Sequence, residues 1–370
     1  MQGLWNHRGA RRVRLTLALL LAVGIATIGS LPAQATSSTF KQVNLVSNIP
    51  GLALHTDPDL VNPWGLSHSA TSPFWVSDNG TGVSTLYNGA GTKQALVVTI
   101  PPPLGSPPGT TATPTGQVFN GTADFVVTNG TTSGRSFFIF ATEDGTISGW
   151  NPSADPTHAI LAVDNSSAEA IYKGLASGAN ASGNFLYAAN FHAGTIDVFD
   201  KDFHQVQLAG SFTDPDIHGG FAPFNIQNLG GKLYVTYAKQ DADGEDDVAG
   251  PANGYVDIFD TNGNLLQRLA TRGRLNSPWG LAFAPPSFGA FAGDLLVGNF
   301  GDGRINVIDP VSGEFLDQLR DANNRAITID GLWGLIVGNG GNGGDPDKVY
   351  FTAGPDDETH GLFGSLAQSS

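Results

Sequence analysis

A five-residue phrase repeats along the chain, as NPWGL at residues 62–66, SPWGL at 277–281 and GLWGL at 331–335. Weaker copies lie between them, as YKGLA at 172–176 and PFNIQ at 223–227. Recurrence at intervals of about fifty residues is typical of one supersecondary unit repeated in a stacked or circular array. This repeat therefore constrains the fold more than any other feature of the sequence.

The residues after each phrase predict the structure of one repeat. An apolar run, a polar residue, a glycine-centred turn and an alternating run follow one another in residues 74–87, 185–200 and 295–309. The period of two in segments such as INVID and VDIFD predicts a strand with one packed and one wetter face. The equivalent polar positions at the end of the apolar run are Asp78, Asn190 and Asn299.

A further strand closes each repeat, as in residues 92–100, 264–271 and 314–320, so the unit is a four-stranded meander. Six four-stranded sheets of this size predict a six-bladed, antiparallel β-propeller, and a solenoid is the structural alternative. The six repeats begin near Trp64, Ala123, Tyr172, Pro223, Trp279 and Trp333.

The two ends of the chain decide between the propeller and the solenoid. The sixth repeat stops after its third strand, whereas residues 40–48 (FKQVNLVSN) form an orphan strand before the first repeat. Pairing this strand with the last blade would close the ring and remove an exposed sheet edge. A solenoid would instead need polar caps. We therefore predict an all-β propeller closed by its N-terminal strand.

The first 35 residues read as a secretory signal peptide. Four arginines precede an apolar run at residues 15–28, and LPAQA follows at 31–35, which predicts cleavage after Ala35. The Sec and twin-arginine routes both remain open. We expect residues 36–370 to form a single propeller domain in the periplasm or outside the cell, with no membrane-spanning segment.

The charge excludes some classes of partner. The formal charge is -15, and removal of the signal peptide, with four arginines and no acid, lowers it by four to -19. Such acidity argues against nucleic acid and anionic membranes, which require basic patches, and favours a cation or a cationic partner. The chain has no cysteine and so no disulfides. We expect a monomer.

The strand pattern resembles the NHL-repeat propellers. More closely, residues 236–259 and 277–309 resemble an uncharacterised family of bacterial exported six-bladed, NHL-like β-propeller proteins. The resemblance implies a propeller fold and export, and it implies no particular chemistry.

In a propeller, the loops that join second to third strands and outer strands to the next blade emerge on one face, which is the usual binding surface of this fold. Imidazole and carboxylate groups that converge there could bind a transition metal. Such a site would support a metal-dependent hydrolase or lyase, as in six-bladed lactonases, although none of their residue patterns is matched here. The hypothesis requires His55, His192, His218 and His360, with Asp78 and Asn299, to converge on one point.

An acidic run in the turn of the fourth blade is a second candidate site. Oxygen ligands at alternate positions suit Ca²⁺, although the run is not an EF-hand loop and could be a solvated loop. The residues are Asp241, Asp243, Glu245, Asp246 and Asp247.

Two classes of function remain open. The first is a binding or scaffold module for an extracytoplasmic protein, glycan or small molecule, and the second is the metal-dependent enzyme. The absence of a nucleophile elbow, P-loop or zincin motif favours binding.

We expect Trp64, Trp279 and Trp333 to pack between blades, and we expect residues 101–116 to form a loop between blades one and two.

Overall fold

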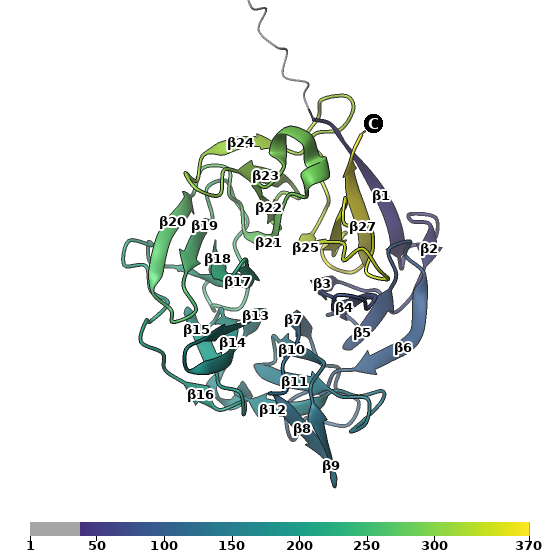
Figure 1. Cartoon of the computed structure of the whole chain (residues 1–370), viewed down its shortest axis with the longest axis vertical. Coiled ribbons are helices and arrows are strands. Elements are labelled where there is room, and N and C mark those ends of the chain that lie inside the picture. The colour runs from purple at the N-terminus through teal and green to yellow at the C-terminus, as the bar shows by residue number, and fades with distance from the viewer. Residues whose placement is uncertain (1–37, 370) are drawn as a thin grey trace, which may run out of the picture. The chain divides into compact units, whose positions relative to one another are not determined.

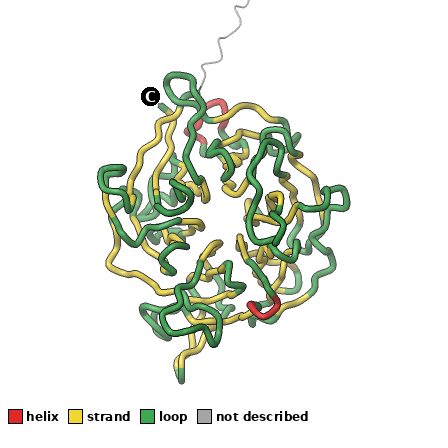
Figure 2. The backbone as a smooth tube through the Cα atoms, turned by 180° about the vertical axis from the view of Figure 1, so that it is seen from behind, coloured by secondary structure: helices red, strands yellow, loops and turns green. Residues whose placement is uncertain are grey.

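The computed structural model describes residues 38–369, and these residues are nearly all β. The predicted signal peptide lies outside the described residues. Six sheets are arranged around a central axis (Figure 1). Seen from behind, the same wheel consists of strands and loops with two short helical turns, η1 (Ser166–Ala168) and η2 (Pro286–Phe291) (Figure 2). The six-bladed β-propeller predicted from the repeats is confirmed.

Each blade is an antiparallel sheet whose first strand lines the axis and whose fourth strand lies at the rim. Blade 1 contains β3 (Pro63–Ser67), β4 (Phe74–Asp78), β5 (Val83–Tyr87) and β6 (Lys93–Thr99). Blade 2 contains β7 (Pro114–Phe119), β10 (Phe138–Thr142), β11 (Thr146–Trp150) and β12 (Ile160–Asp164). Blade 3 contains β13 (Tyr172–Asn180), β14 (Gly183–Asn190), β15 (Thr195–Phe199) and β16 (Gln205–Val206).

The remaining blades follow the same plan, and the predicted fourth strands of blades 4 and 5 are confirmed. Blade 4 contains β17 (Phe221–Leu229), β18 (Lys232–Lys239), β19 (Tyr255–Phe259) and β20 (Leu265–Thr271). Blade 5 contains β21 (Pro278–Phe283), β22 (Leu295–Asn299), β23 (Ile305–Ile308) and β24 (Phe315–Gln318). Blade 6 contains β25 (Leu332–Val337), β26 (Val349–Ala353) and β27 (Leu362–Gln368), together with two strands from the start of the chain.

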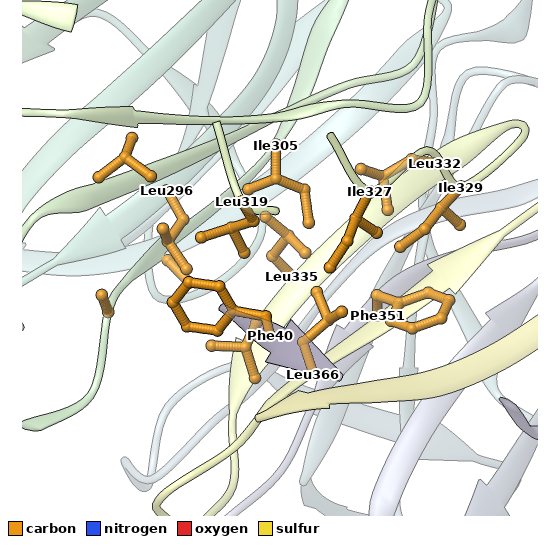
Figure 3. Close-up of a cluster of buried hydrophobic side chains, with 14 of the residues drawn as sticks. Phe40, Leu296, Ile305, Leu319, Ile327, Ile329, Leu332, Leu335, Phe351 and Leu366 are labelled. Atoms are coloured by element: carbon orange, nitrogen blue, oxygen red, sulfur yellow. The ribbon is translucent and has the colours of Figure 1, made fainter. Parts of the chain in front are cut away.

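The N-terminal strand closes the ring, as predicted. β1 (Phe40–Ser47) pairs antiparallel with β27, from Phe40 opposite Gln368 to Ser47 opposite Leu362. The short β2 (His55–Thr56) adds a parallel strand outside β1, which the sequence pattern did not predict. Phe40 is 1% exposed and packs in a cluster with Leu366 and Phe351 of blade 6 and Leu319 of blade 5 (Figure 3). The two ends of the chain are thus joined in one core.

Blade 2 begins earlier than the sequence predicted. Its inner strand is β7, so the long loop that starts at Pro101 ends before Pro114 and does not extend to Gly116. The segment after Ala123, which was expected to be the inner strand, forms a separate hairpin of β8 (Val126–Asn129) and β9 (Thr132–Arg135). This hairpin protrudes from the wheel (Figure 1).

A glycine explains why the inner strand lies at PTGQV. A Cβ on Gly116 would lie 2.2 Å from the backbone nitrogen of Leu175 in blade 3, and one on Gly65 would lie 2.4 Å from the carbonyl oxygen of Thr115 in blade 2. Adjacent inner strands therefore pack backbone to backbone at the glycine of the repeated phrase. PTGQV keeps this glycine without the tryptophan, so the phrase was missed.

The third strands of blades 4 and 5 are buried on both faces, contrary to the expectation of one wetter face, whereas β15 keeps the expected alternation, with Thr195 exposed and Asp197 half-buried. Every residue of β19 and β23 is buried, including the polar Asp257 and Asn306. The reason is that each blade is packed between two neighbouring blades. Side chains that alternate along such a strand therefore face one interface or the other, and neither set faces solvent.

Among the residues that the structure describes, no helix is long and apolar enough to cross a membrane.

Candidate functional site

The loops between second and third strands, and those between one blade and the next, gather at one end of the wheel, which we call the loop face. There the central channel is closed by Trp64, Trp279 and Trp333. The rings of Trp64 and Trp333 stack at 3.5 Å between centroids, and Trp279 meets both edge-on, at 6.1 and 5.8 Å. All three rings are buried and pack against one another across blades 1, 5 and 6, in keeping with the expected core role, from the position that precedes the glycine of the phrase. We call these three rings the tryptophan plug.

Lys173 occupies the same position of the phrase in blade 3 and lies beside the plug. Its side chain is 3% exposed, and its Nζ lies 2.6 Å from Glu143 Oε1 and 3.0 Å from Asp246 Oδ1. The ammonium group also lies 5.4 Å from the centroid of the Trp64 ring. Burial alone lowers the pKa of Lys173, but the charges of Glu143 and Asp246 outweigh burial and raise it above its ordinary value. Lys173 is therefore a permanently charged, buried cation.

A hydrogen-bonded chain continues from Glu143 around the channel. Asn79 donates from Nδ2 to Glu143 Oε2 at 2.8 Å, and Asn62 donates from Nδ2 to Asn79 Oδ1 at 3.3 Å. The same amide of Asn62 donates to Glu358 Oε2 at 2.6 Å, while its Oδ1 accepts the indole N–H of Trp333 at 3.0 Å. The chain fixes both carboxylates over the plug. We call its members the channel mouth: Asn62, Asn79, Glu143, Lys173, Asp246 and Glu358.

The channel mouth carries more negative than positive charge. Three carboxylates face one ammonium group, and the Glu143 side chain is 24% exposed while that of Asp246 is 77% exposed. Burial, together with the charges of Glu143 and Asp246, raises the pKa of Glu358 to about 7 against the opposing effects of Asn62 and Lys173. The mouth is therefore suited to receive a second positive charge.

The structure does not bring the four predicted histidines together. His55 lies on β2 at the outer edge of blade 6, 3.2 Å from the carbonyl oxygen of Ala90. His192 Nε2 lies 3.8 Å from Glu169, and His360 Nδ1 lies 3.2 Å from the amide nitrogen of Asn48. His218 is exposed on the loop between β16 and β17.

The two other members of that hypothesis are internal structural residues. Asp78 and Asn299 are fully buried at the equivalent ends of β4 and β22, as the repeat predicted. Asp78 Oδ2 accepts the backbone N–H of Thr85 at 3.0 Å. Within residues 38–369, the group of three side chains that could share a metal is Asp200, Asp202 and His204, in the turn between β15 and β16, away from the loop face. A metal-dependent activity gains no converging ligand set at the channel mouth.

The five acids of the fourth blade point to different partners. Asp241 Oδ1 accepts the backbone N–H of Glu245 at 3.0 Å, and Asp246 pairs with Lys173. Burial raises the pKa of Asp247, while Asp243 and Glu245 are exposed. Calcium binding here stays a prediction, which a shift of the thermal unfolding midpoint in millimolar calcium would test.

Sequence reasoning pointed to the same loop face and, of the mouth residues, proposed only Asp246 as a site residue, in a different role. Asn62 is the first residue of the phrase at 62–66, and Lys173 replaces tryptophan in the weaker copy at 172–176, so both positions could have been noticed. Glu143 and Glu358 lie in polar turns with no motif of their own, and only the three-dimensional structure brings them together.

No protein-family model matches the chain. The uncharacterized protein R648 of Acanthamoeba polyphaga mimivirus is 34% identical over 338 residues, which cover 90% of this chain and 81% of that protein. The chain belongs to the family of this mimivirus protein. Because this member is viral, the family gives no support to the bacterial origin that the sequence resemblance implied.

Two solved structures share the fold of the family. A protein of unknown function from Bacteroides thetaiotaomicron VPI-5482 matches with a TM-score of 0.54 and 11% identity, covering 90% of this chain and 76% of that one. A streptogramin B lyase matches with a TM-score of 0.50 and 12% identity, covering 90% of this chain and 98% of that one. At these identities the similarity supports the β-propeller fold alone.

Proposed function

We propose that this protein is a binding module whose channel mouth recognises a cationic group on its ligand. The observation that carries the proposal is the set of three carboxylates around a single buried ammonium group, with two of the carboxylates held by the amides of Asn62 and Asn79. Charged groups that are fixed before the ligand arrives bind at a lower entropic cost than mobile ones.

The wider loop face supports a cationic ligand. The loop between β26 and β27 adds Asp356 and Asp357 beside Glu358, and the loop between β18 and β19 adds Asp243 and Glu245. The chain as a whole has a formal charge of -15. A face of one sign attracts ligands of the opposite sign and accelerates their association.

Lys173 indicates which cationic groups fit the site. Its ammonium group is held between two carboxylates beside an aromatic ring, which is also how a free ammonium or guanidinium group is recognised. The half-buried carboxylates of Glu143 and Glu358 offer a second position for a cation. The ligand class is therefore an organic amine or guanidinium compound.

Tryptophan fluorescence provides the test. The plug lies directly beneath the mouth, so binding of arginine amide should change the emission of the protein. Glu143→Gln should weaken binding about tenfold, because each charge-assisted contact contributes on the order of 1.5–3 kcal/mol. Asp202→Asn, at the rim away from the loop face, is the control and should bind like the wild type. Citrulline amide, which lacks the positive charge, should bind weakly.

Either of two results would remove the proposal. Equal binding of arginine amide and citrulline amide would show that charge is not recognised. Equal loss of binding in Glu143→Gln and Asp202→Asn would show that the mouth is not the site.

One observation keeps the enzyme hypothesis as a second candidate. A carboxyl group with a pKa of about 7, as at Glu358, can exchange a proton at neutral pH and so act as a general acid or base. Elemental analysis for bound metal, together with hydrolysis assays on simple lactones and esters, tests it. A metal-free protein that hydrolyses none of them would leave binding as the function.

Export belongs to the same proposal and rests on the sequence of residues 1–35. If the signal peptide is cleaved as predicted, the protein recovered outside the cytoplasm begins at Thr36, which intact-mass measurement would reveal. Recovery of the full-length chain in the cytoplasm would contradict it.

A further inference from the structure

A second compartment of the channel lies beneath the tryptophan plug. A cavity of 230 Å³ is lined by the inner strands, from the glycine of the phrase onward, and by Trp279. At about 30 Å³ per water, it has room for about eight water molecules. Because Trp279 also belongs to the plug, this cavity and the channel mouth lie on opposite sides of one aromatic layer.

The polar groups of the cavity wall are amides held in fixed positions. Gln117 donates from Nε2 to the carbonyl oxygens of Gly65 and Trp75, at 2.8 and 2.9 Å. Asn225 donates to the carbonyl oxygen of Trp279 at 2.8 Å, and Asn228 donates to that of Ser177 at 2.8 Å. An amide offers two N–H donors and two acceptor lone pairs, so Asn225 and Asn228 keep unused capacity of both kinds.

The cavity wall differs from the mouth in its charge. Its lining contains no aspartate, glutamate, lysine or arginine, and its one ionisable residue, His68, has both ring nitrogens within 3.0 Å of backbone carbonyl oxygens. The rest of the wall combines aliphatic side chains with Phe119, Trp279 and the polar side chains of Ser67, Ser177 and Gln227. A concave, half-apolar pocket with a few fixed polar groups is the usual form of a small-molecule site.

We propose that this cavity is a second binding site, which accepts a small uncharged polyhydroxy compound such as a cyclic polyol or monosaccharide. Hydroxyl groups both donate and accept hydrogen bonds, and so they match Asn225 and Asn228, whose amides each donate one hydrogen bond and accept one and keep one further N–H and one further lone pair. The carbon-bound hydrogens of such a ring match the aliphatic wall and the indole face. A charged ligand is disfavoured, because no opposite charge in the lining would offset its desolvation.

Saturation-transfer NMR with myo-inositol, glucose and galactose tests the site. Ser177 and Gln227 are half-buried wall residues, and neither side chain donates or accepts a hydrogen bond within residues 38–369. Gln227→Leu should weaken binding about tenfold, and Ser177→Phe, which fills the cavity, should abolish it. Thermal unfolding of both variants verifies that they fold, and Glu143→Gln at the mouth should bind the sugars like the wild type.

Three outcomes would overturn the inference. These are the absence of binding for all three probes at millimolar concentration, unchanged binding in a folded Ser177→Phe variant, and loss of binding in Glu143→Gln. None of them bears on recognition of cations at the mouth, which is measured with arginine amide. Retained sugar binding in Glu143→Gln together with its loss in Ser177→Phe would establish the second site.

Discussion

Asn62 and Glu358 are separated by 296 positions in the chain and are joined by a hydrogen bond of 2.6 Å. Asn62 lies at the entrance to the first blade, and Glu358 lies in a loop of the last. The bond therefore crosses the seam where the ring closes. Because Asn62 also reaches Asn79 and Trp333, the same residue links ring closure, the tryptophan plug and the channel mouth.

Asn62→Ala should destabilise the protein. The change leaves the buried indole N–H of Trp333 without its acceptor and removes the donor to Glu358. A lost buried hydrogen bond of this kind costs about 1–3 kcal/mol. Urea unfolding monitored by circular dichroism measures the loss, and Asn129→Ala, at the exposed tip of the β8–β9 hairpin, is the control. Equal stability of the two variants would contradict the role given to Asn62.

Lys173→Met should cost more than Asn62→Ala. It removes a buried cation and leaves the negative charges of Glu143 and Asp246 facing each other, and breaking such a pair costs about 3–5 kcal/mol. Solvent access to both carboxylates places the expected loss near 3 kcal/mol, at the lower end of that range. In a double-mutant cycle, Glu143→Gln should restore part of the stability of Lys173→Met. Strictly additive losses would show that the two side chains do not interact.

Stability should fall as the pH rises from about 5 to about 7. Burial raises the pKa of Glu358 to about 7, and burial with the nearby charge of Asp214 does the same for Asp257. Between the ordinary carboxyl pKa of about 4 and this raised value, the folded state holds more protons than the unfolded state, so a rise in pH favours unfolding.

Other carboxyl groups act in a different pH range. The pKa values of Asp241 and Asp155 are lowered, so their contribution is lost only below the ordinary range for aspartate. Urea midpoints at pH 5, 6, 7 and 8 would reveal the decline, which should be smaller in Glu358→Gln and Asp257→Asn. A midpoint that rises steadily over this range would refute the assignment.

Phe40→Ala tests the closure of the ring. Phe40 is 1% exposed and packs 4.8 Å from the ring of Phe288, so its truncation leaves a cavity and should cost about 3–5 kcal/mol. Leu54→Ala is a suitable control, because Leu54 is 68% exposed and should tolerate the change. A loss no larger than that of Leu54→Ala would mean that the N-terminal strand does not hold the wheel together.

Most of the fold could be predicted from the sequence because the residues of the repeated phrase lie where the inner strands of adjacent blades pack together. The glycine of WGL lies at the contact between inner strands in five of the six blades, with Asn225 in its place in blade 4, and tryptophan at the preceding position in three blades marks the channel. Blade 2 was misplaced because threonine replaces tryptophan there and because the apolar DFVVT segment looks like a strand. It is a strand, but one that pairs within a projecting hairpin.

The candidate site was harder to predict. Its histidines were chosen because imidazole binds metals, and the structure distributes them over the rim, the seam and an exposed loop. The mouth is built from ordinary residues such as Glu143 and Glu358, whose importance comes from the closure of the ring. A local pattern cannot reveal contacts between residues that lie in different blades.

A structure of crystals soaked in arginine amide would test the central claim most directly. The account predicts the guanidinium group at the channel mouth, between the carboxylates of Glu143 and Glu358 and above the tryptophan plug. Occupancy elsewhere on the protein, with this position left to solvent, would contradict it.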